Sequence, residues 1–242
     1  MIANVTLIHT IFDALAWIGA VLSYCLLTRA FAVKFPTLRA GWRYTAVLVF
    51  GAGVAAISFG TVNLWLSHQT GFARSIEGAI LGGIVAVELY KRGARIVGRT
   101  GARFALPLAT GVAIGRIGCF LAGLDDFTYG TPTALPWGHD FGDGVLRHPV
   151  QLYESAGMAA FAIVYVAGVR RGDRFVIENG FYLAAGCYAL QRFAWEFLKP
   201  YGALIGPLTL FHAVSIAILL YAVVMIATAP SLKRAVDDRV RA

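Results

Sequence analysis

Residues 104–124 read FALPLATGVAIGRIGCFLAGL, and residues 178–198 read ENGFYLAAGCYALQRFAWEFL. Both stretches have the length of a membrane-spanning helix and are mostly apolar, yet each contains one arginine, Arg116 and Arg192. A guanidinium stays charged at any usable pH, and placing one near the middle of a helix in lipid costs at least about 3 kcal/mol. We therefore expect both arginines to meet an anion inside the membrane.

The rest of the chain also has the composition of a membrane protein. Of its 242 residues, 58% are hydrophobic and 14% are charged, which is too apolar for an ordinary soluble domain. The net charge of +8 lies in short loops between apolar stretches, so it does not indicate a nucleic-acid partner. All three cysteines fall in apolar stretches, which argues against a disulfide framework. We expect a single transmembrane domain over residues 1–242.

Seven stretches are long and apolar enough to cross a membrane as helices. The predicted spans are 7–29, 44–66, 76–90, 104–124, 150–169, 178–198 and 203–228. The fold class is therefore predicted to be all-α, a polytopic membrane protein with seven transmembrane helices. The longest loop, 125–149, is rich in Gly, Pro and Asp and is expected to form a small extracytoplasmic head.

Basic residues set the expected orientation, because loops that keep Lys and Arg stay in the cytoplasm. One set of loops holds fifteen of them and the opposite set holds three. The fifteen are Lys34, Arg39, Arg43, Lys91, Arg92, Arg95, Arg99, Arg103, Arg170, Arg171, Arg174, Lys233, Arg234, Arg239 and Arg241, and the three are Arg74, Arg147 and Lys199. We expect the N-terminus outside and the C-terminus in the cytoplasm.

Polar side chains of at least four predicted spans collect in their outer halves. Arg116 lies about 12 Å and Arg192 about 9 Å below the outer ends of their spans, at 1.5 Å per residue. The others are Glu77, Gln151, Tyr153, Glu154, Tyr188 and Glu196. Because guanidinium binds phosphate oxygens bidentately, this pattern favours an outward-facing site for an anionic phospholipid headgroup. The alternative is purely structural pairing, of Arg192 with Glu196 and of Arg116 with Glu77 or Glu154.

Four segments resemble motifs of the prolipoprotein diacylglyceryl transferase family. Residues 147–154 (RHPVQLYE) closely resemble its R-H-P-x-Q-L-Y-E motif, and residues 115–120 (GRIGCF) resemble G-R-[IL]-G-N-F. Residues 192–197 (RFAWEF) resemble R-x-x-x-E-F, and residues 75–78 (SIEG) stand where the family carries S-F-H-G-G. The resemblance covers roughly residues 71–200.

The resemblance implies a bacterial cytoplasmic-membrane enzyme that transfers a diacylglyceryl group from phosphatidylglycerol to the cysteine thiol of a prelipoprotein. Arg116 and Arg192 would hold the lipid phosphate and stabilise the leaving group, Tyr188 would hydrogen-bond the substrate, and Glu77 would be the base. The expected substrate-binding residues are Arg147, His148, Gln151, Tyr153, Glu154, Glu196 and Cys119. The expected partners are phosphatidylglycerol or another anionic phospholipid and a lipoprotein signal peptide or another thiol acceptor.

Two departures from the family pattern leave alternatives open. Glu77 replaces a histidine suited to be the base, and Cys119 replaces an asparagine. The chain is therefore also compatible with a different acceptor, or with a non-catalytic phospholipid-binding or scaffold homologue. A lipid or anion transporter fits the buried charges but not their clustering on one side.

No cofactor or metal is expected from the sequence. The residues that suggest a metal are Asp125, Asp126, Asp140, Asp143 and His139, and they lack a tight ligand spacing. His9 and His212 are expected to be packing or interface histidines.

Overall fold

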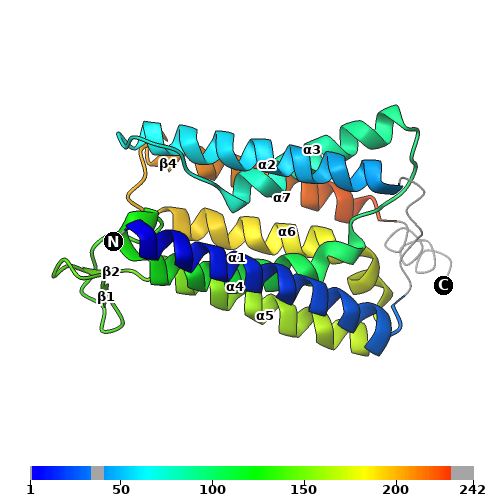
Figure 1. The fold of residues 1–242 in the computed structure, drawn as a ribbon. Helices are drawn as coiled ribbons and strands as arrows, with labels where there is room; N and C mark the ends of the chain where they lie inside the picture. Colours follow the sequence, from blue (N-terminus) through cyan, green and yellow to red (C-terminus); the bar gives the residue numbers. More distant parts are fainter. Residues whose placement is uncertain (1, 34–40, 230–242) are drawn as a thin grey trace.

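The computed structural model describes residues 2–33 and 41–229, and this part of the chain folds into a bundle of seven α-helices (Figure 1). The helices are α1 (Ile2–Cys25), α2 (Gly41–Leu66), α3 (Ile76–Gly93), α4 (Ala105–Ala122), α5 (Val150–Arg170), α6 (Arg174–Glu196) and α7 (Leu210–Ala227). A π-helical turn, η1 (Leu26–Ala30), extends α1, and two 3-10 turns, η2 (Ala102–Phe104) and η3 (Gly123–Asp126), flank α4. The expected helical fold is confirmed.

The last two predicted spans begin at the wrong residues. Helix α6 begins at Arg174 rather than 178, because the Asp173 carboxylate caps it and accepts the backbone N–H groups of Phe175 and Val176 at 2.9 and 3.2 Å. Helix α7 begins at Leu210 rather than 203, because residues 203–209 form a hairpin.

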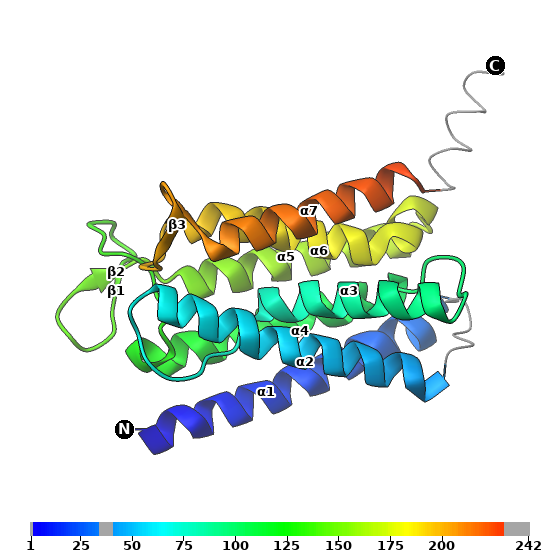
Figure 2. The same cartoon turned by 90° about the horizontal axis from the view of Figure 1, so that it is seen from above.

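Two short antiparallel hairpins lie at one end of the bundle, so the fold is not purely helical (Figures 1 and 2). Strand β1 (His139–Asp140) pairs with β2 (Leu146–Arg147), with His139 opposite Arg147. Strand β3 (Ala203–Ile205) pairs with β4 (Leu208–Thr209), with Ala203 opposite Thr209. Gly206, between β3 and β4, has φ +57°, a conformation that favours glycine. We call this end of the bundle the hairpin end.

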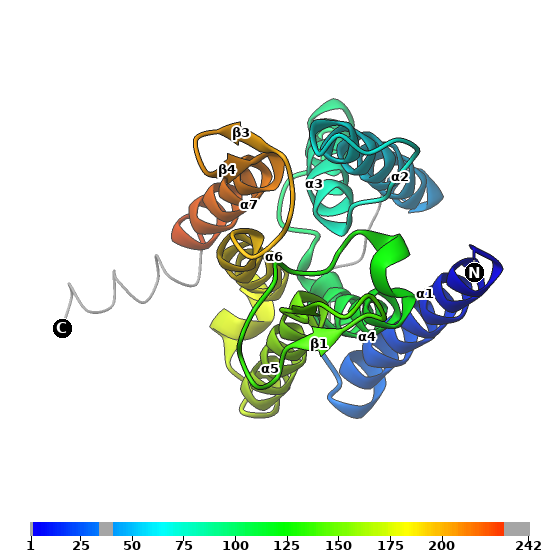
Figure 3. The same cartoon turned by 90° about the vertical axis from the view of Figure 1, so that its left-hand side faces the viewer.

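Helix α6 lies between α5 and α7 in the end-on view of Figure 3, and it contacts α4 as well. Helix α1 packs on the outside of α4, and α2 packs on the outside of α3. The core between the inner helices includes Ile80, Ala109, Met158, Tyr188 and Ile218. Side chains that α6 presents on several sides are therefore covered by neighbouring helices, which is what a polar helix in a membrane needs.

Five segments of the described chain are long and apolar enough to span a membrane, namely Val5–Ala30, Gly41–Leu66, Ala102–Asp126, Val150–Arg170 and Leu210–Ala227. Helices α3 and α6 are absent from that set. Both carry several charged residues, which the bundle covers in part, so their membrane spanning stays a prediction.

The described members of the larger predicted basic set lie at the end opposite the hairpins. They stand at the start of α2, at the end of α3, before α4, and between α5 and α6. Six residues of the predicted basic set lie outside the described residues: Lys34, Arg39, Lys233, Arg234, Arg239 and Arg241.

Glycines let α2 and α3 approach closely. A Cβ added at Gly82 would overlap the Cβ of Ala55 and would lie 2.5 Å from the backbone oxygen of Gly51. A Cβ added at Gly78 would lie 2.7 Å from the backbone oxygen of Ala55. Small residues have this role between membrane helices, where van der Waals packing drives association.

We predict that Gly82→Ala lowers the melting temperature of the detergent-solubilised protein by about 2–12 °C, because overpacking costs roughly 1–3 kcal/mol. The matched control is Gly53→Ala on α2, where an added Cβ meets no atom within 4 Å. That control should melt at or above the wild-type temperature, since alanine favours a helix. Equal melting temperatures for the two variants would contradict the close α2–α3 approach.

Candidate active site

Arg192 lies at the centre of a buried cluster of charges at the hairpin end. Its three nitrogens each pair with a different carboxylate: Nε with Glu77 Oε2 at 3.2 Å, Nη1 with Glu154 Oε1 at 3.0 Å, and Nη2 with Glu196 Oε2 at 2.7 Å. Glu77 stands in the first turn of α3, Glu154 in the first turns of α5, and Glu196 at the end of α6. One guanidinium therefore joins three helices.

Glu154 joins this arginine to two further cations. Its Oε2 atom pairs with Arg116 Nε from α4, and its Oε1 atom lies 3.1 Å from Lys199 Nζ. The side chains of Glu154 and Lys199 are both fully buried. We refer to Glu77, Arg116, Glu154, Arg192, Glu196 and Lys199 as the charge network; at full ionisation it holds three positive and three negative charges.

The structure brings the two predicted arginines together, as the sequence analysis expected. It also contains ion pairs that the structural alternative named, Arg192 with Glu196 and Arg116 with Glu154. The two guanidiniums thus share a carboxylate of the chain itself. The buried pairs by themselves are compatible with a structural role as well as a binding role.

Lys199 is a network residue that the sequence analysis missed. It was counted as an outer loop cation, but the connection after α6 folds it back against Glu154 and over the ring of Tyr201, 5.6 Å from its centroid. Burial and the nearby Arg192 guanidinium lower the pKa of Lys199 to about 8. Its position three residues after Glu196 is the one feature of the sequence that places Lys199 near the polar residues of α6.

Two hydroxyl groups near the start of α7 donate to the carboxylate oxygens of Glu77 and Glu196 that do not pair with Arg192. Ser215 Oγ donates to Glu77 Oε1, and Thr209 Oγ1 donates to Glu196 Oε1 at 2.5 Å. Thr209 also caps α7: its backbone N–H donates to His212 Nδ1 at 3.0 Å. His212 is buried with its ring against Phe193 and Phe197, which confirms the packing role expected for it.

Tyr188 lies one turn before Arg192 on α6 and is fully buried. Among the described residues its hydroxyl has no hydrogen-bond partner, although the charges of Arg116, Glu154 and Arg192 act on it. A buried hydroxyl without a partner is costly, so a substrate oxygen is a natural partner for it.

The remaining predicted residues divide between the network and the surface. Cys119 Sγ accepts a weak contact from Arg116 Nη1 at 3.8 Å. Gln151 is buried, and its Nε2 donates to Thr128 Oγ1 at 3.3 Å. Of the RHPVQLYE segment, only Glu154 enters the charge network.

Arg147, His148 and Tyr153 lie at the surface of the hairpin end instead. Tyr153 accepts a hydrogen bond from Trp137 Nε1 at 2.8 Å and lies 3.4 Å from His148 Nδ1. Arg147 Nη1 donates to Asp143 Oδ1 at 2.7 Å, and this hydrogen bond lowers the pKa of the Asp143 carboxyl. Their predicted role in substrate binding stays a prediction, and none of the three contacts the charge network.

An apolar cavity of about 410 Å³ lies between the α1–α4 and α2–α3 pairs, and no side chain of the charge network is among its lining residues. Ile76 and Ile80, on either side of Glu77 along α3, line it. Trp17 and Leu108 belong to its walls as well. Towards the opposite end it reaches Glu88, which accepts a hydrogen bond from Tyr221 at 3.0 Å. The space is therefore apolar, with Glu88 at the end away from the charge network.

A bundle of apolar helices that encloses buried ion pairs and an apolar cavity defines the class, a helical membrane protein. The family model described as prolipoprotein diacylglyceryl transferase matches residues 5–228, and the chain belongs to that family.

Three curated relatives carry the name phosphatidylglycerol–prolipoprotein diacylglyceryl transferase. The protein of Teredinibacter turnerae is 34% identical over 59% of this chain and 50% of its own length. The Geobacter sulfurreducens protein is 31% identical over 74% of this chain and 72% of its own, and the Azoarcus sp. protein is 30% identical over 80% and 84%. The match thus spans about half of the first relative. No solved structure matches the chain significantly.

We predict that Glu154→Gln lowers the free energy of unfolding by about 3–5 kcal/mol, because three buried cations would lose the carboxylate that they share. The readout is the melting temperature in detergent. The control is Asp143→Asn, which also removes a carboxylate from an arginine pair, but at the surface. It should melt as the wild type does, since exposed pairs contribute little. A Glu154→Gln protein as stable as the control would show that the shared carboxylate does not stabilise the bundle.

Proposed function

We propose that the chain transfers a diacylglyceryl group from phosphatidylglycerol to the thiol of a prelipoprotein cysteine. Family membership supports the reaction. The observation that supports the site most is that the wall of the apolar cavity includes Ile76, the residue next to Glu77 on α3. A buried charge network and an apolar cavity at neighbouring positions suit a lipid, whose charged headgroup and apolar chains must be bound side by side.

We propose that the cavity binds an acyl chain of the lipid donor. Its lining is almost entirely apolar, from Ile76 near the network to Phe104 and Tyr182 farther along the bundle. Transferring methylene groups between bulk lipid and such a cavity changes little free energy, so the cavity positions the donor rather than providing its affinity. The charged groups must then select the headgroup.

Arg116 is the cation best placed to take the phosphate. Glu154 engages its Nε atom, and among the described residues its Nη atoms have only the weak contact with Cys119. A guanidinium has five N–H donors, so most of them remain for phosphate oxygens. Arg192 is more fully engaged, and it acts by adding positive charge beside the phosphate.

Glu77 is the proposed base, and its change from a charged carboxylate to a neutral acid compensates the negative charge that the reaction creates. The acceptor thiol gives its proton to the Glu77 carboxylate, and the thiolate sulfur attacks the glycerol carbon. The carbon–oxygen bond to the phosphate breaks, and glycerol phosphate leaves with one more negative charge than the phosphodiester had. Protonation of Glu77 gives the charge network one net positive charge at that moment, which stabilises the leaving group.

We place this reaction at the outer leaflet of the bacterial cytoplasmic membrane, with all seven helices crossing it. The basic residues at the opposite end support that orientation, which puts the N-terminus and the loop 125–149 outside. Arg147, His148 and Tyr153 would then face the side from which a lipoprotein signal peptide arrives.

The second candidate is a homologue that binds a phospholipid without turnover, or that transfers the lipid to another acceptor. The observation that favours it is the double engagement of Glu77, because Arg192 occupies one carboxylate oxygen and Ser215 the other, and a thiol must compete with them. One assay separates these functions: purified protein, phosphatidylglycerol and a lipobox peptide, analysed by mass spectrometry. Thioether product supports the transferase, and retained lipid without product supports the alternative.

We predict that Arg116→Lys and Arg192→Lys each lower the rate of transfer by about 100- to 1000-fold, because a lysine supplies a point charge in place of a planar donor fork. Labelled phosphatidylglycerol measures the rate. Arg74→Lys is the control, since this arginine forms an exposed pair with Asp13. Transfer at the wild-type rate by both network variants would refute the assignment of the phosphate site.

We predict that Glu77→Gln lowers kcat at least about 100-fold while phosphatidylglycerol still binds, because the variant loses the proton acceptor and little of the lipid site. Glu178→Gln, at an exposed position on α6, is the control. The pH dependence of kcat tests whether Glu77 acts chemically, and the ionisation on the acidic side should disappear in the variant. A full rate in Glu77→Gln would assign the base to another residue.

A further inference from the structure

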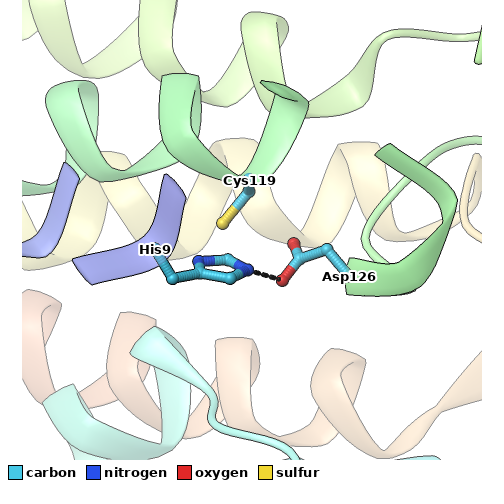
Figure 4. A group of neighbouring side chains, drawn as sticks. All are labelled: His9, Cys119 and Asp126. Atoms are coloured by element: carbon cyan, nitrogen blue, oxygen red, sulfur yellow. Dashed lines mark ion pairs between the residues drawn. The ribbon is translucent and has the colours of Figure 1, made fainter. Parts of the chain in front are cut away.

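Three side chains that are distant in the sequence meet beside the charge network at the hairpin end. His9 comes from α1, Cys119 from α4, and Asp126 from the turn η3 that follows α4 (Figure 4). His9 Nε2 lies 2.8 Å from Asp126 Oδ1, and one donor atom from each of the three residues lies within 4.8 Å of the other two. All three residues are partly buried.

An imidazole nitrogen, a thiolate sulfur and a carboxylate oxygen are the donors that Zn²⁺ takes in proteins. Tetrahedral zinc with bonds of about 2.0–2.3 Å needs its ligand atoms about 3.3–3.7 Å apart. The present separations reach that range if the side chains shift by about 1 Å, which rotamer adjustment allows. A hydrogen bond already fixes the Asp126 carboxylate, because Thr128 Oγ1 donates to its other oxygen, Oδ2, at 2.5 Å.

The charges of the ligands also suit a zinc ion, which binds cysteine as the thiolate. One thiolate and one carboxylate balance the two charges of Zn²⁺. A bound ion would therefore leave the balance of the neighbouring charge network unchanged.

We propose that His9, Cys119 and Asp126 form a Zn²⁺ site with an open fourth coordination position, although no metal site is expected from the sequence. Zinc at this place connects α1 to α4 and η3. The most apolar stretch of α1 has no buried residues. A bond from His9 to the metal would therefore hold α1 against α4 more firmly. The ion also fixes Cys119, and through it the position of Arg116. The site rests on this geometry and not on the transferase proposal.

Zinc content of the full chain tests the site directly. The protein is purified in detergent, dialysed against metal-free buffer, loaded with Zn²⁺ and analysed by inductively coupled plasma mass spectrometry. About one zinc per chain is expected for the wild type, and the affinity should fall on the order of tenfold or more in His9→Ala, Cys119→Ser and Asp126→Asn. Wild-type protein that retains no zinc overturns the proposal.

Three matched controls change a histidine, a cysteine and an aspartate that are not proposed ligands. His139→Ala, Cys187→Ser and Asp125→Asn should each retain one zinc per chain. Loss of zinc in a control, or full zinc affinity in all three site variants, overturns the assignment of ligands. None of these readouts depends on lipid transfer, so failure of the zinc site and failure of the proposed function are distinguishable.

Cobalt provides a second measurement that does not require a variant to fold. Co²⁺ in the wild-type site should give the intense visible bands of tetrahedral coordination and a thiolate-to-metal charge-transfer band. Zn²⁺ should bleach both signals, and it should raise the melting temperature of the wild type. A cobalt spectrum without the thiolate band would exclude Cys119 as a ligand.

Discussion

The shared carboxylate of Glu154 is the interaction on which the hairpin end of this bundle depends. It pairs with Arg116, Arg192 and Lys199, and it is fully buried. An uncompensated charge in this environment would cost several kcal/mol, so each of these side chains constrains where the others lie. The network thereby sets the relative positions of α4, α5 and α6, and Glu77 adds α3 through Arg192.

The same constraint explains how the charged helices are arranged. Helices α3 and α6 carry more charged residues than the other five helices, and α6 contacts α4, α5 and α7. The more apolar α1 and α2 lie on the outside, where lipid would contact them (Figure 3). Polar groups are therefore kept inside the protein, and the free energy of removing them from water is offset by ion pairs and hydroxyl groups.

A balanced set of charges is also a suitable starting point for the proposed chemistry. With three cations and three carboxylates, the network has no net charge until a proton or an anion enters it. Protonation of one carboxylate and arrival of one phosphate compensate each other. A site built in this way couples the proton transfer to the charge of the leaving group, which is where preorganised electrostatics contributes most.

The sequence by itself determined the helical membrane fold, the end of the bundle that holds the polar groups, and the family. Hydropathy and the RHPVQLYE segment are local signals, so they needed no knowledge of contacts. The sequence also placed five polar residues at one end of the bundle, namely Glu77, Arg116, Glu154, Arg192 and Glu196. The direction of each predicted span and the position of the residue along it give the depth of that residue in the membrane.

Only the tertiary structure decided which charges pair. Lys199 stands in a connection whose path the sequence does not specify, and the β3–β4 hairpin replaces the predicted first turns of the last span. His9 and Cys119 are 110 residues apart, and they meet because α1 packs on α4. Pairing of this kind depends on helix packing and rotation, which the spacing of residues along one helix cannot give.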